Sequence, residues 1–199
     1  VFMEKAPRTV ELDRSYSEQN LKYDIAQVRA LRAFAYFYMV RIWGDVPLVT
    51  YSYDNGTFPS MPRTDAQTVL SYAKAELLTA IEDLPYQYGT QTNLYYGSYG
   101  AQWQGKLFNK LSAYSVLAHI CAWQGNYAEA ETYSAFIIDH ASEINAKYTS
   151  IADLTSETGL FYSNASVKGS RILGFNFAHN DNEATQSGHL EQLTLAYPL

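Results

Sequence analysis

The sequence has one cysteine, few charged residues and no long hydrophobic run, and each shortage argues against a class of protein. Cys121 alone cannot form an internal disulfide or a multi-cysteine zinc site. The longest uninterrupted apolar run, residues 33–40, is much shorter than the about 20 residues that cross a bilayer. Lys and Arg number 14 against 20 Asp and Glu, and the net charge of −6 argues against a nucleic-acid partner, because few cations are available for phosphates.

Aromatic residues, in contrast, are abundant. Apolar residues make up 47% of the 199 positions, which is enough for a buried core and predicts one domain over residues 1–199. Aromatic residues reach 15%, including 18 tyrosines, whereas only 17% of the residues are charged. Tyrosine packs as an apolar ring and still offers a hydroxyl, so this composition suits wet interfaces and polar ligands. The chain opens on Val1 without a visible signal peptide, and we expect a segment of a longer protein whose targeting information lies elsewhere.

The spacing of apolar residues predicts an all-α fold. Four helices are expected, packed as two antiparallel hairpins, at residues 17–43, 64–84, 106–123 and 126–141. The first has an apolar stripe that widens until its middle is apolar almost all round, formed by Ile25, Val28, Leu31, Ala35, Met39 and Ile42 together with Phe34, Phe37 and Val40. We expect this helix to be buried on most sides and to end at Gly44. Residues 1–16 are expected to form a polar arm, and residues 171–177 a short strand.

Two of the expected helices begin with capping signals. Thr64 precedes Gln67 by three residues, which is the spacing of a capping box. Asn126 precedes Glu129 by the same interval and is the expected cap of the fourth helix.

The third and fourth expected helices carry the pattern of a tetratricopeptide repeat, in which small side chains permit a close helix crossing and a glycine turns the corner. The matching residues are Leu117, Ala118, Gly125, Asn126, Tyr127 and Ala130. The end of the second helix, residues 80–85, resembles the end of another such repeat. A generic antiparallel helical bundle is the alternative interpretation.

The order of several short segments is more specific than either repeat. These segments are RALRAFAYF at 29–37, VRIWGDVPLV at 40–49, PRTD at 62–65, DLP at 83–85, GK at 105–106 and WQGNY at 123–127. In this order they resemble the SusD/RagB family, whose members are surface glycan-binding lipoproteins of Gram-negative bacteria. The resemblance is dense over residues 17–141 and looser as far as residue 199.

The resemblance implies a tetratricopeptide-like helical scaffold whose irregular loops hold an oligosaccharide. It also implies a partner, a SusC-like TonB-dependent outer-membrane transporter to which the glycan is passed. Family members are longer and begin with a lipidated cysteine, so the resemblance places the full-length protein on the outer-membrane surface through a lipid anchor that this chain lacks. Glycan contacts vary between family members, and none can be transferred to this sequence residue by residue.

A loop at residues 86–105 is the candidate binding region, because long irregular loops in compact domains are usually functional. A sugar ring has an apolar C–H face and a hydroxyl rim, so it suits flat aromatic rings beside amide groups. The residues expected to bind carbohydrate are Tyr95, Tyr96, Tyr99 and Trp103. The competing interpretation is that the rings of this loop, including Tyr86 and Tyr88, form a small core of their own. Tyr51 and Tyr53, in an earlier loop, are a weaker second set.

The sequence predicts neither an enzyme nor a cofactor. Ser71 and Lys74 match the S-x-x-K pattern of penicillin-binding enzymes, but they lie within a predicted helix and lack a K-T-G partner. Glycoside hydrolysis needs two carboxylates facing each other across the bond, and no such pair is evident. The four histidines lack ligand spacing, so no metal site is expected. Arg29, Arg32 and Arg41, on the buried first helix, are expected to form structural ion pairs, since a buried unpaired charge is costly.

Two functions of different classes compete, and a hydrolase is a third and weaker hypothesis. The leading one is non-catalytic binding of an oligosaccharide for uptake through the transporter. The alternative is a tetratricopeptide-type scaffold for protein–protein interaction without its own sugar site. Loop rings that point outward favour the first, whereas rings that point inward favour the second.

Overall fold

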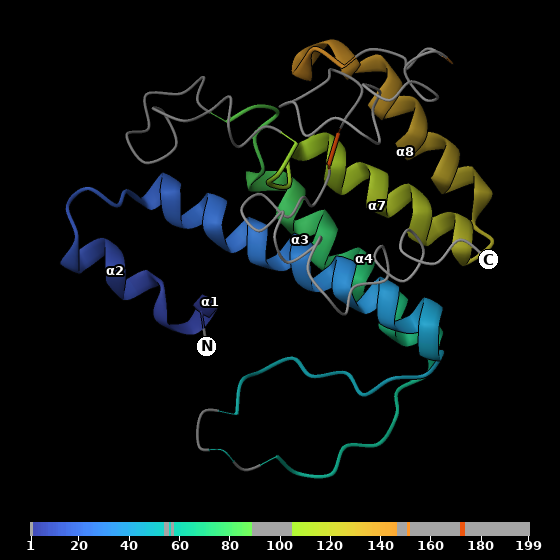
Figure 1. Cartoon of the computed structure of the whole chain (residues 1–199), viewed down its shortest axis with the longest axis horizontal. Coiled ribbons are helices and arrows are strands. Elements are labelled where there is room, and N and C mark those ends of the chain that lie inside the picture. Colours follow the sequence, from blue (N-terminus) through green and yellow to red (C-terminus); the bar gives the residue numbers. More distant parts are fainter. Residues whose placement is uncertain are drawn as a thin grey trace, which may run out of the picture.

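The computed structural model describes residues 2–53, 56, 58–88, 105–146, 151, 172 and 173. Its helices, labelled as in Figure 1, are α1 (Phe2–Lys5), α2 (Pro7–Leu12), α3 (Glu18–Trp43), α4 (Ala66–Asp83), α7 (Lys110–Trp123), α8 (Tyr127–Asp139) and the 3-10 helix η1 (Ala141–Ile144). Extended backbone pairs in these residues at one isolated bridge, between Val46 and Thr64. The predicted all-α class is confirmed.

The four long helices form two hairpins (Figure 1). α3 packs along α4, α7 packs along α8, and α4 also contacts α7, which connects the two pairs. The predicted pairing of the helices is therefore confirmed. Residues 44–65, which we call the α3–α4 loop, protrude from the end of these two helices.

The start of α4 differs from the prediction. Asp65 is the cap, because its carboxylate accepts a 2.9 Å hydrogen bond from the N–H of Thr68. The carboxylate of Asp45 accepts a second one, also 2.9 Å, from the N–H of Ala66. Thr64 is not the cap, since its backbone is already used in the extended bridge. Two carboxylates at a helix N-terminus also complement its dipole, which explains why they displace a neutral threonine.

The start of α7 also differs, whereas that of α8 agrees. Asn109 and Ser112 form a reciprocal capping box with two hydrogen bonds of 2.8 Å, so α7 begins at Lys110 and not at residue 106. At α8, the side chain of Asn126 accepts from the N–H of Glu129, as predicted. An asparagine cap is hard to recognise when its partner is a serine instead of a glutamate.

The first helix of each hairpin ends at a glycine. Gly44 follows α3 with φ of 69°, and Gly125 follows α7 with φ of 78°. Residues other than glycine rarely adopt this positive φ, so each glycine allows the chain to turn sharply away from its helix. Both helix ends are where the sequence predicts them.

Alanines form the middle of the buried stripe of α3, and Tyr23, Tyr36, Phe37 and Val40 continue it on either side. Ala26, Ala30 and Ala33 are at most 1% exposed, and these small side chains let α3 approach α4 closely. The predicted stripe is wrong in part, because Leu31 and Ile42 are 51% and 63% exposed. Since α3 is apolar on almost every side, periodicity cannot identify the face that the alanines select.

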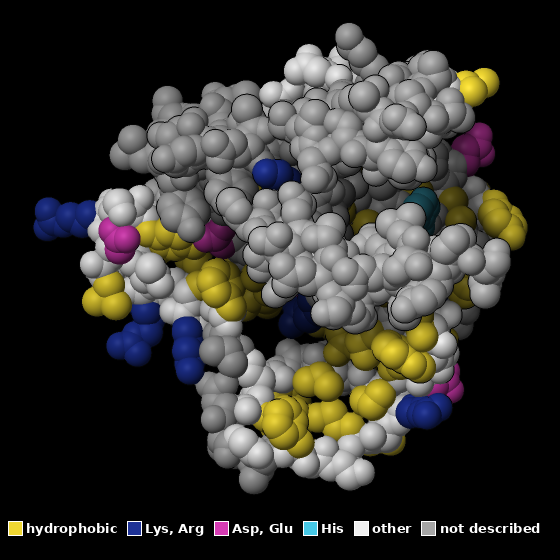
Figure 2. Space-filling view, in the orientation of Figure 1, with side chains coloured by type: hydrophobic (Ala, Val, Ile, Leu, Met, Phe, Trp, Pro, Cys, Tyr) yellow, Lys and Arg dark blue, Asp and Glu magenta, His cyan; other side chains and the backbone are white. Residues whose placement is uncertain are grey.

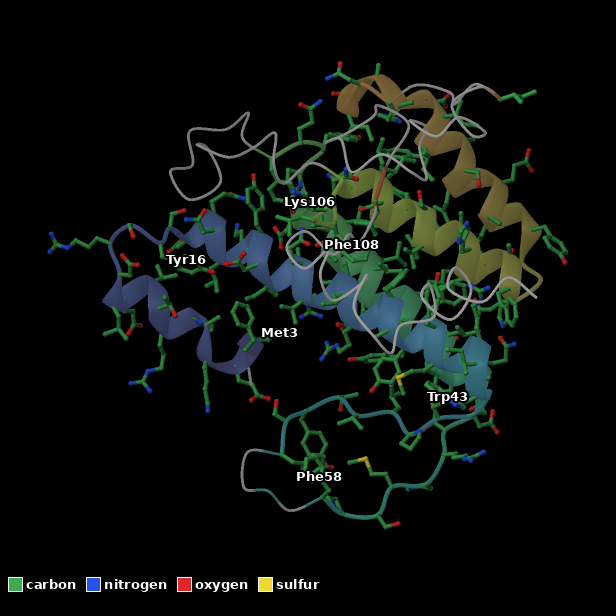
Figure 3. All side chains as sticks on the ribbon, viewed as in Figure 1. Met3, Tyr16, Trp43, Phe58, Lys106 and Phe108 are labelled. Carbon is green, nitrogen blue, oxygen red and sulfur yellow. The ribbon has the colours of Figure 1, made fainter. Side chains whose placement is uncertain are left out.

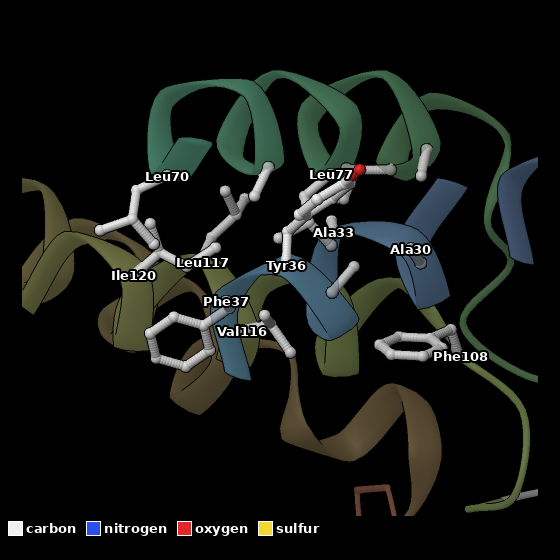
Figure 4. Packing of buried hydrophobic residues seen from close by; sticks show 14 of the residues in the cluster. Ala30, Ala33, Tyr36, Phe37, Leu70, Leu77, Phe108, Val116, Leu117 and Ile120 are labelled. Atoms are coloured by element: carbon white, nitrogen blue, oxygen red, sulfur yellow. The ribbon is translucent and has the colours of Figure 1, made fainter. Parts of the chain in front are cut away.

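Larger aliphatic side chains from the other helices complete the core (Figure 4). Leu70 and Leu77 of α4 lie in one cluster with Leu117 and Ile120 of α7, close to Phe37 of α3. All four aliphatic side chains are less than 2% exposed. The core therefore lies where the two hairpins meet.

Helices also form near the N-terminus, where the sequence predicts an irregular arm. Pro7 occupies the first turn of α2, where its missing N–H breaks no hydrogen bond. α1 and α2 are too short for apolar periodicity to reveal them. The strand predicted at 171–177 lies, apart from residues 172 and 173, outside the described residues.

Cys121 is expected to react slowly with thiol reagents in the native protein. The thiol is fully buried on α7, and this burial raises its pKa, which lowers the fraction of reactive thiolate. Reaction then requires opening of the core, so we expect a rate at least about a hundredfold below that of the unfolded chain. The rates with a chromogenic disulfide in buffer and in urea measure this ratio. Equal rates would mean that α7 does not pack as described.

Candidate functional site

The four residues predicted to bind carbohydrate, Tyr95, Tyr96, Tyr99 and Trp103, lie outside the described residues. Two rings at the start of the same loop are described. Tyr88 is 5% exposed, and its hydroxyl donates to the carbonyl of Phe108 at 2.7 Å. Burial raises the pKa of Tyr88, so this hydroxyl remains a donor at neutral pH. Tyr86 is half-buried and stacks parallel to His140, so these two rings belong to the scaffold.

Gln27 of α3 ties both sides of that loop to the scaffold. Its Nε2 donates to the hydroxyl of Tyr88 and to the carbonyl of Phe108, and its Oε1 accepts from the N–H of Phe108 at 2.9 Å. Residues 88 and 108 are thereby held against the same helix, which fixes where the loop leaves and rejoins the fold. Gln27 could not be predicted from the sequence, because a lone amide within a helical pattern carries no signal.

The α3–α4 loop is fixed to the helices at two levels. At its neck, Val46 and Thr64 exchange backbone hydrogen bonds of 3.2 and 3.0 Å. Further out, the hydroxyl of Tyr36 donates to the carbonyl of Val49 at 2.9 Å and accepts from its N–H at 2.7 Å. One hydroxyl thus satisfies both the N–H and the carbonyl of Val49. The backbone is therefore fixed against α3 at the point where residues 50–53 begin.

Three rings of this loop form an exposed group that we call the loop aromatic cluster: Tyr51, Tyr53 and Phe58 (Phe58 is labelled in Figure 3). The ring centroids are 4.8 Å apart for Tyr51 and Tyr53, and 5.5 Å apart for Tyr53 and Phe58. Tyr51 and Phe58 are 59% and 77% exposed. The hydroxyl of Tyr53 donates to that of Tyr51 at 2.7 Å, which raises the pKa of Tyr53 to about 12. The second set of rings predicted from the sequence thus lies largely on the surface.

A pocket of about 240 Å³ lies between α1, α3 and residues 49–52. Figure 2 shows the molecule hollowed between the α3–α4 loop and the helices, and Met3 of α1 is labelled beside this space in Figure 3. α3 contributes Val28 and Arg32 to the pocket, and the loop contributes the ring of Tyr51. The pocket therefore combines apolar walls, a guanidinium group and an exposed aromatic ring.

Arg32 belongs to an ion-pair group between α3 and α4. The Nη1 of Arg29 lies 2.8 Å from one carboxylate oxygen of Glu76, and the Nε of Arg32 lies 3.1 Å from the other. The Nη2 of Arg32 also donates to Glu76, whose side chain is only 10% exposed. The predicted structural ion pairs are confirmed for Arg29 and Arg32. Glu76 holds both guanidinium groups in place, and so it fixes the wall of the pocket.

Arg41 differs from the other two arginines. It is exposed, and its guanidinium carbon lies 5.2 Å from the ring centre of Tyr38 and 5.4 Å from that of Trp123. Within the described residues these cation–π contacts replace the predicted ion pair. No ion pair of Arg41 is found within the part of the chain that the structure describes, and the end of α3 that carries it is exposed instead of buried.

The S-x-x-K match does not form a nucleophile and base in the structure. Lys74 donates to both carboxylate oxygens of Glu129, at 2.6 and 2.5 Å, and so links α4 to α8. Burial opposes the charge of Lys74, but the hydrogen bond to Glu129 prevails and raises its pKa. A lysine with a raised pKa remains protonated and cannot accept a proton from Ser71.

The described residues show neither a metal-binding cluster nor a membrane-spanning helix. No three His, Cys, Asp or Glu side chains there gather as a group that could hold a metal ion. Among the helices of the same residues, none has the length and apolar character needed to cross a membrane.

Comparison with solved structures gives clear similarities. A SusD superfamily protein from Bacteroides thetaiotaomicron VPI-5482 is 95% identical, with a TM-score of 0.85, and the match covers 99% of this chain and 41% of that one. Surface glycan-binding protein A from Bacteroides uniformis is 25% identical over 62% of this chain and 26% of its own, with a TM-score of 0.51. A laminarin-binding SusD-like protein, 24% identical over 68% of this chain and 26% of its own, shares the fold at a TM-score of 0.51.

Neither a protein-family model nor a curated protein sequence matches the chain. The chain spans about 41% of the length of its 95% identical relative, so the solved protein is more than twice as long. The chain nevertheless agrees with that relative in its helical fold and is nearly identical to it over almost every residue, which establishes its family. This chain belongs to the SusD superfamily.

Proposed function

We propose that the protein binds an oligosaccharide and does not cleave it. The observation that carries this proposal is the near-identity to a SusD superfamily protein. Another structural relative with the same fold is named a surface glycan-binding protein. The exposed loop aromatic cluster, beside a pocket with mixed polar and apolar walls, supports the same conclusion. Aromatic rings next to hydrogen-bonding groups suit the two kinds of surface that a sugar presents.

The alternative, a tetratricopeptide-type scaffold for proteins without a sugar site, has less support. The solved relatives include proteins described as binding carbohydrate, laminarin or glycan. The inward packing of Tyr88 favours the alternative for that ring, whereas the exposed rings of Tyr51 and Phe58 favour a ligand-binding loop.

We further propose that the full-length protein is held on the surface of the outer membrane by a lipid anchor. There it passes its glycan to a SusC-like TonB-dependent transporter. This proposal rests on the family resemblance. Purification of the protein from outer membranes in mild detergent, followed by identification of co-purifying proteins, tests it. A large outer-membrane barrel protein in stoichiometric amount is expected, and purification of the protein alone would contradict the proposal.

Tyr95, Tyr96, Tyr99 and Trp103 remain proposed sugar contacts. If Trp103 stacks on a sugar, Trp103→Ala should weaken glycan binding several-fold, because stacking on one ring contributes about 0.5–1.5 kcal/mol. Calorimetric titration of both proteins with the same oligosaccharide measures the effect, and melting curves show whether the scaffold is intact. Unchanged affinity would remove Trp103 from the site, and a collapsed melting temperature would assign it to the core.

Oligosaccharide binding itself can be tested on an array of glycans probed with the wild-type protein. We expect signal on at least one family of polysaccharide fragments. The protein-scaffold alternative predicts an empty array.

A further inference from the structure

The two tyrosines of the loop aromatic cluster are arranged for a covalent reaction with each other. We propose that Tyr51 and Tyr53 form a site of oxidative modification, at which a one-electron oxidant joins their rings into a dityrosine crosslink. This inference goes beyond the proposed function, because it concerns a reaction of the chain itself and needs no bound ligand.

The local backbone places the two rings on one side of the loop. Side chains two positions apart point to the same face of an extended chain, and residues 49–53 contain no helix. The hydroxyl of Tyr36 fixes this backbone at Val49 through two hydrogen bonds, only two residues before the pair. The rings are therefore held together before any oxidant arrives, which favours their reaction with each other over reaction with more distant groups.

The reactive ends of the two rings are the parts that meet. The ring centroids lie 4.8 Å apart, the ring planes are tilted by 52°, and the two hydroxyl oxygens are 2.7 Å apart. A tyrosyl radical spreads its unpaired electron over the oxygen and the ring carbons next to it, and rings couple at these ortho carbons. Because the hydroxyls are in contact, an ortho carbon of Tyr51 lies close to one of Tyr53.

The crosslinking step balances as a two-electron oxidation. Each phenol loses one electron to the oxidant and its hydroxyl proton to water. The two radicals combine, and a carbon–carbon bond forms between one ortho carbon of each ring. The proton on each of these carbons then moves to an oxygen, which restores both aromatic rings and both hydroxyls. Two equivalents of a one-electron oxidant take up the electrons in total, and the chain is left two hydrogens lighter.

The exposure of the pair distinguishes it from other tyrosine contacts. The ring of Tyr51 is 59% exposed, so a dissolved oxidant reaches it directly. Within the described residues, three further tyrosine pairs have centroids 5.7 to 6.0 Å apart, and each includes rings that are buried or half-buried in the helical scaffold: Tyr23 with Tyr88, Tyr36 with Tyr72, and Tyr114 with Tyr133. The loop pair is thus both closer and more accessible than these three.

Photo-oxidation followed by peptide mass spectrometry tests the inference. The protein is illuminated with a ruthenium tris-bipyridyl complex, and persulfate accepts the electrons and becomes sulfate. Trypsin then cleaves after Arg41 and Arg63, which places both tyrosines in the single peptide 42–63. The expected product is this peptide with two hydrogens fewer, together with the fluorescence of dityrosine.

Two conservative variants and one control identify the reacting rings. Tyr51→Phe and Tyr53→Phe each remove one hydroxyl, and we expect either change to lower the yield of the crosslinked peptide at least about tenfold. Tyr127→Phe is the matched control, because Tyr127 is a 72% exposed tyrosine on α8 and not in the loop. This variant should give the wild-type yield. Melting curves of the three variants are expected to match that of the wild type, since none of the three rings is buried.

Three results would overturn the proposal. The first is a peptide 42–63 that keeps all its hydrogens, or only gains oxygen, under conditions that oxidise other tyrosines. The second is dityrosine found only between two copies of the chain, as a dimer on a denaturing gel. The third is an unchanged yield of the lighter peptide in Tyr51→Phe or Tyr53→Phe. None of these results depends on whether the protein binds a glycan, so the proposed function is tested separately.

Discussion

Replacement of Glu76 with alanine is expected to lower the free energy of unfolding by about 3 kcal/mol. The carboxylate of Glu76 is 10% exposed and neutralises both Arg29 and Arg32, so its loss leaves two guanidinium groups facing each other between α3 and α4. Breaking a buried ion pair from one side typically costs about 3–5 kcal/mol. The lower end applies, because the arginine side chains keep 28% and 24% exposure and water can reach them. For a chain of this size the melting temperature should fall by roughly 6–12 °C.

A triple variant separates loss of charge balance from loss of packing. Arg29→Met, Arg32→Met and Glu76→Leu together remove every charge of the group while keeping similar volumes. Well-packed apolar substitutes for a buried ion pair are often neutral or stabilising. We therefore expect the triple variant to melt near the wild-type temperature, well above Glu76→Ala. If Glu76→Ala has the same melting temperature as the wild type, the ion-pair group does not hold α3 against α4.

Leu117→Ala is expected to destabilise the protein by about 2–5 kcal/mol, as other leucine truncations in well-packed cores do. Leu117 is completely buried on α7, in the cluster that includes Leu70 of α4 and Phe37 of α3 (Figure 4). Truncation leaves a cavity at the junction of the two hairpins, where fixed helices limit collapse. Urea denaturation of the variant and the wild type measures the difference in free energy.

The matched control for this prediction is Leu78→Ala. Leu78 is the neighbour of Leu77 on α4, but it is 40% exposed and lies outside the core cluster. Its truncation should change the free energy of unfolding by no more than about 0.5 kcal/mol. Equal losses in the two leucine variants would mean that the hairpins do not meet at Leu117.

The helical fold is predictable from this sequence because its signals are strong and local. Gly44 and Gly125 end helices that the apolar spacing predicts, and Asn126 caps α8 as its spacing to Glu129 indicates. The buried face of α3 is not predictable, because alanines compete with larger residues for the same role. Which face of α3 is buried depends on its packing against the partner helix. Leu31, on a face that does not pack there, is half exposed.

The candidate site is less predictable than the fold. Composition indicates aromatic loops, and Tyr51 is among the residues that the sequence suggests. The pocket, however, is assembled from α1, α3 and the α3–α4 loop, whose contact depends on tertiary packing. The partner of Arg32 is equally hidden, since Glu76 is 44 residues away along the chain. Tyr36 donates its hydroxyl to the carbonyl of Val49, and no sequence pattern indicates this hydrogen bond.

A crystal structure of the protein soaked with the tightest-binding oligosaccharide tests the central claim most directly. That claim is that loops on a SusD superfamily helical scaffold bind sugar through exposed aromatic rings. We predict that density for the oligosaccharide contacts the ring of Tyr51 or the loop at residues 86–105. Sugar density confined to the outer faces of α7 and α8, away from both loops, would contradict the account.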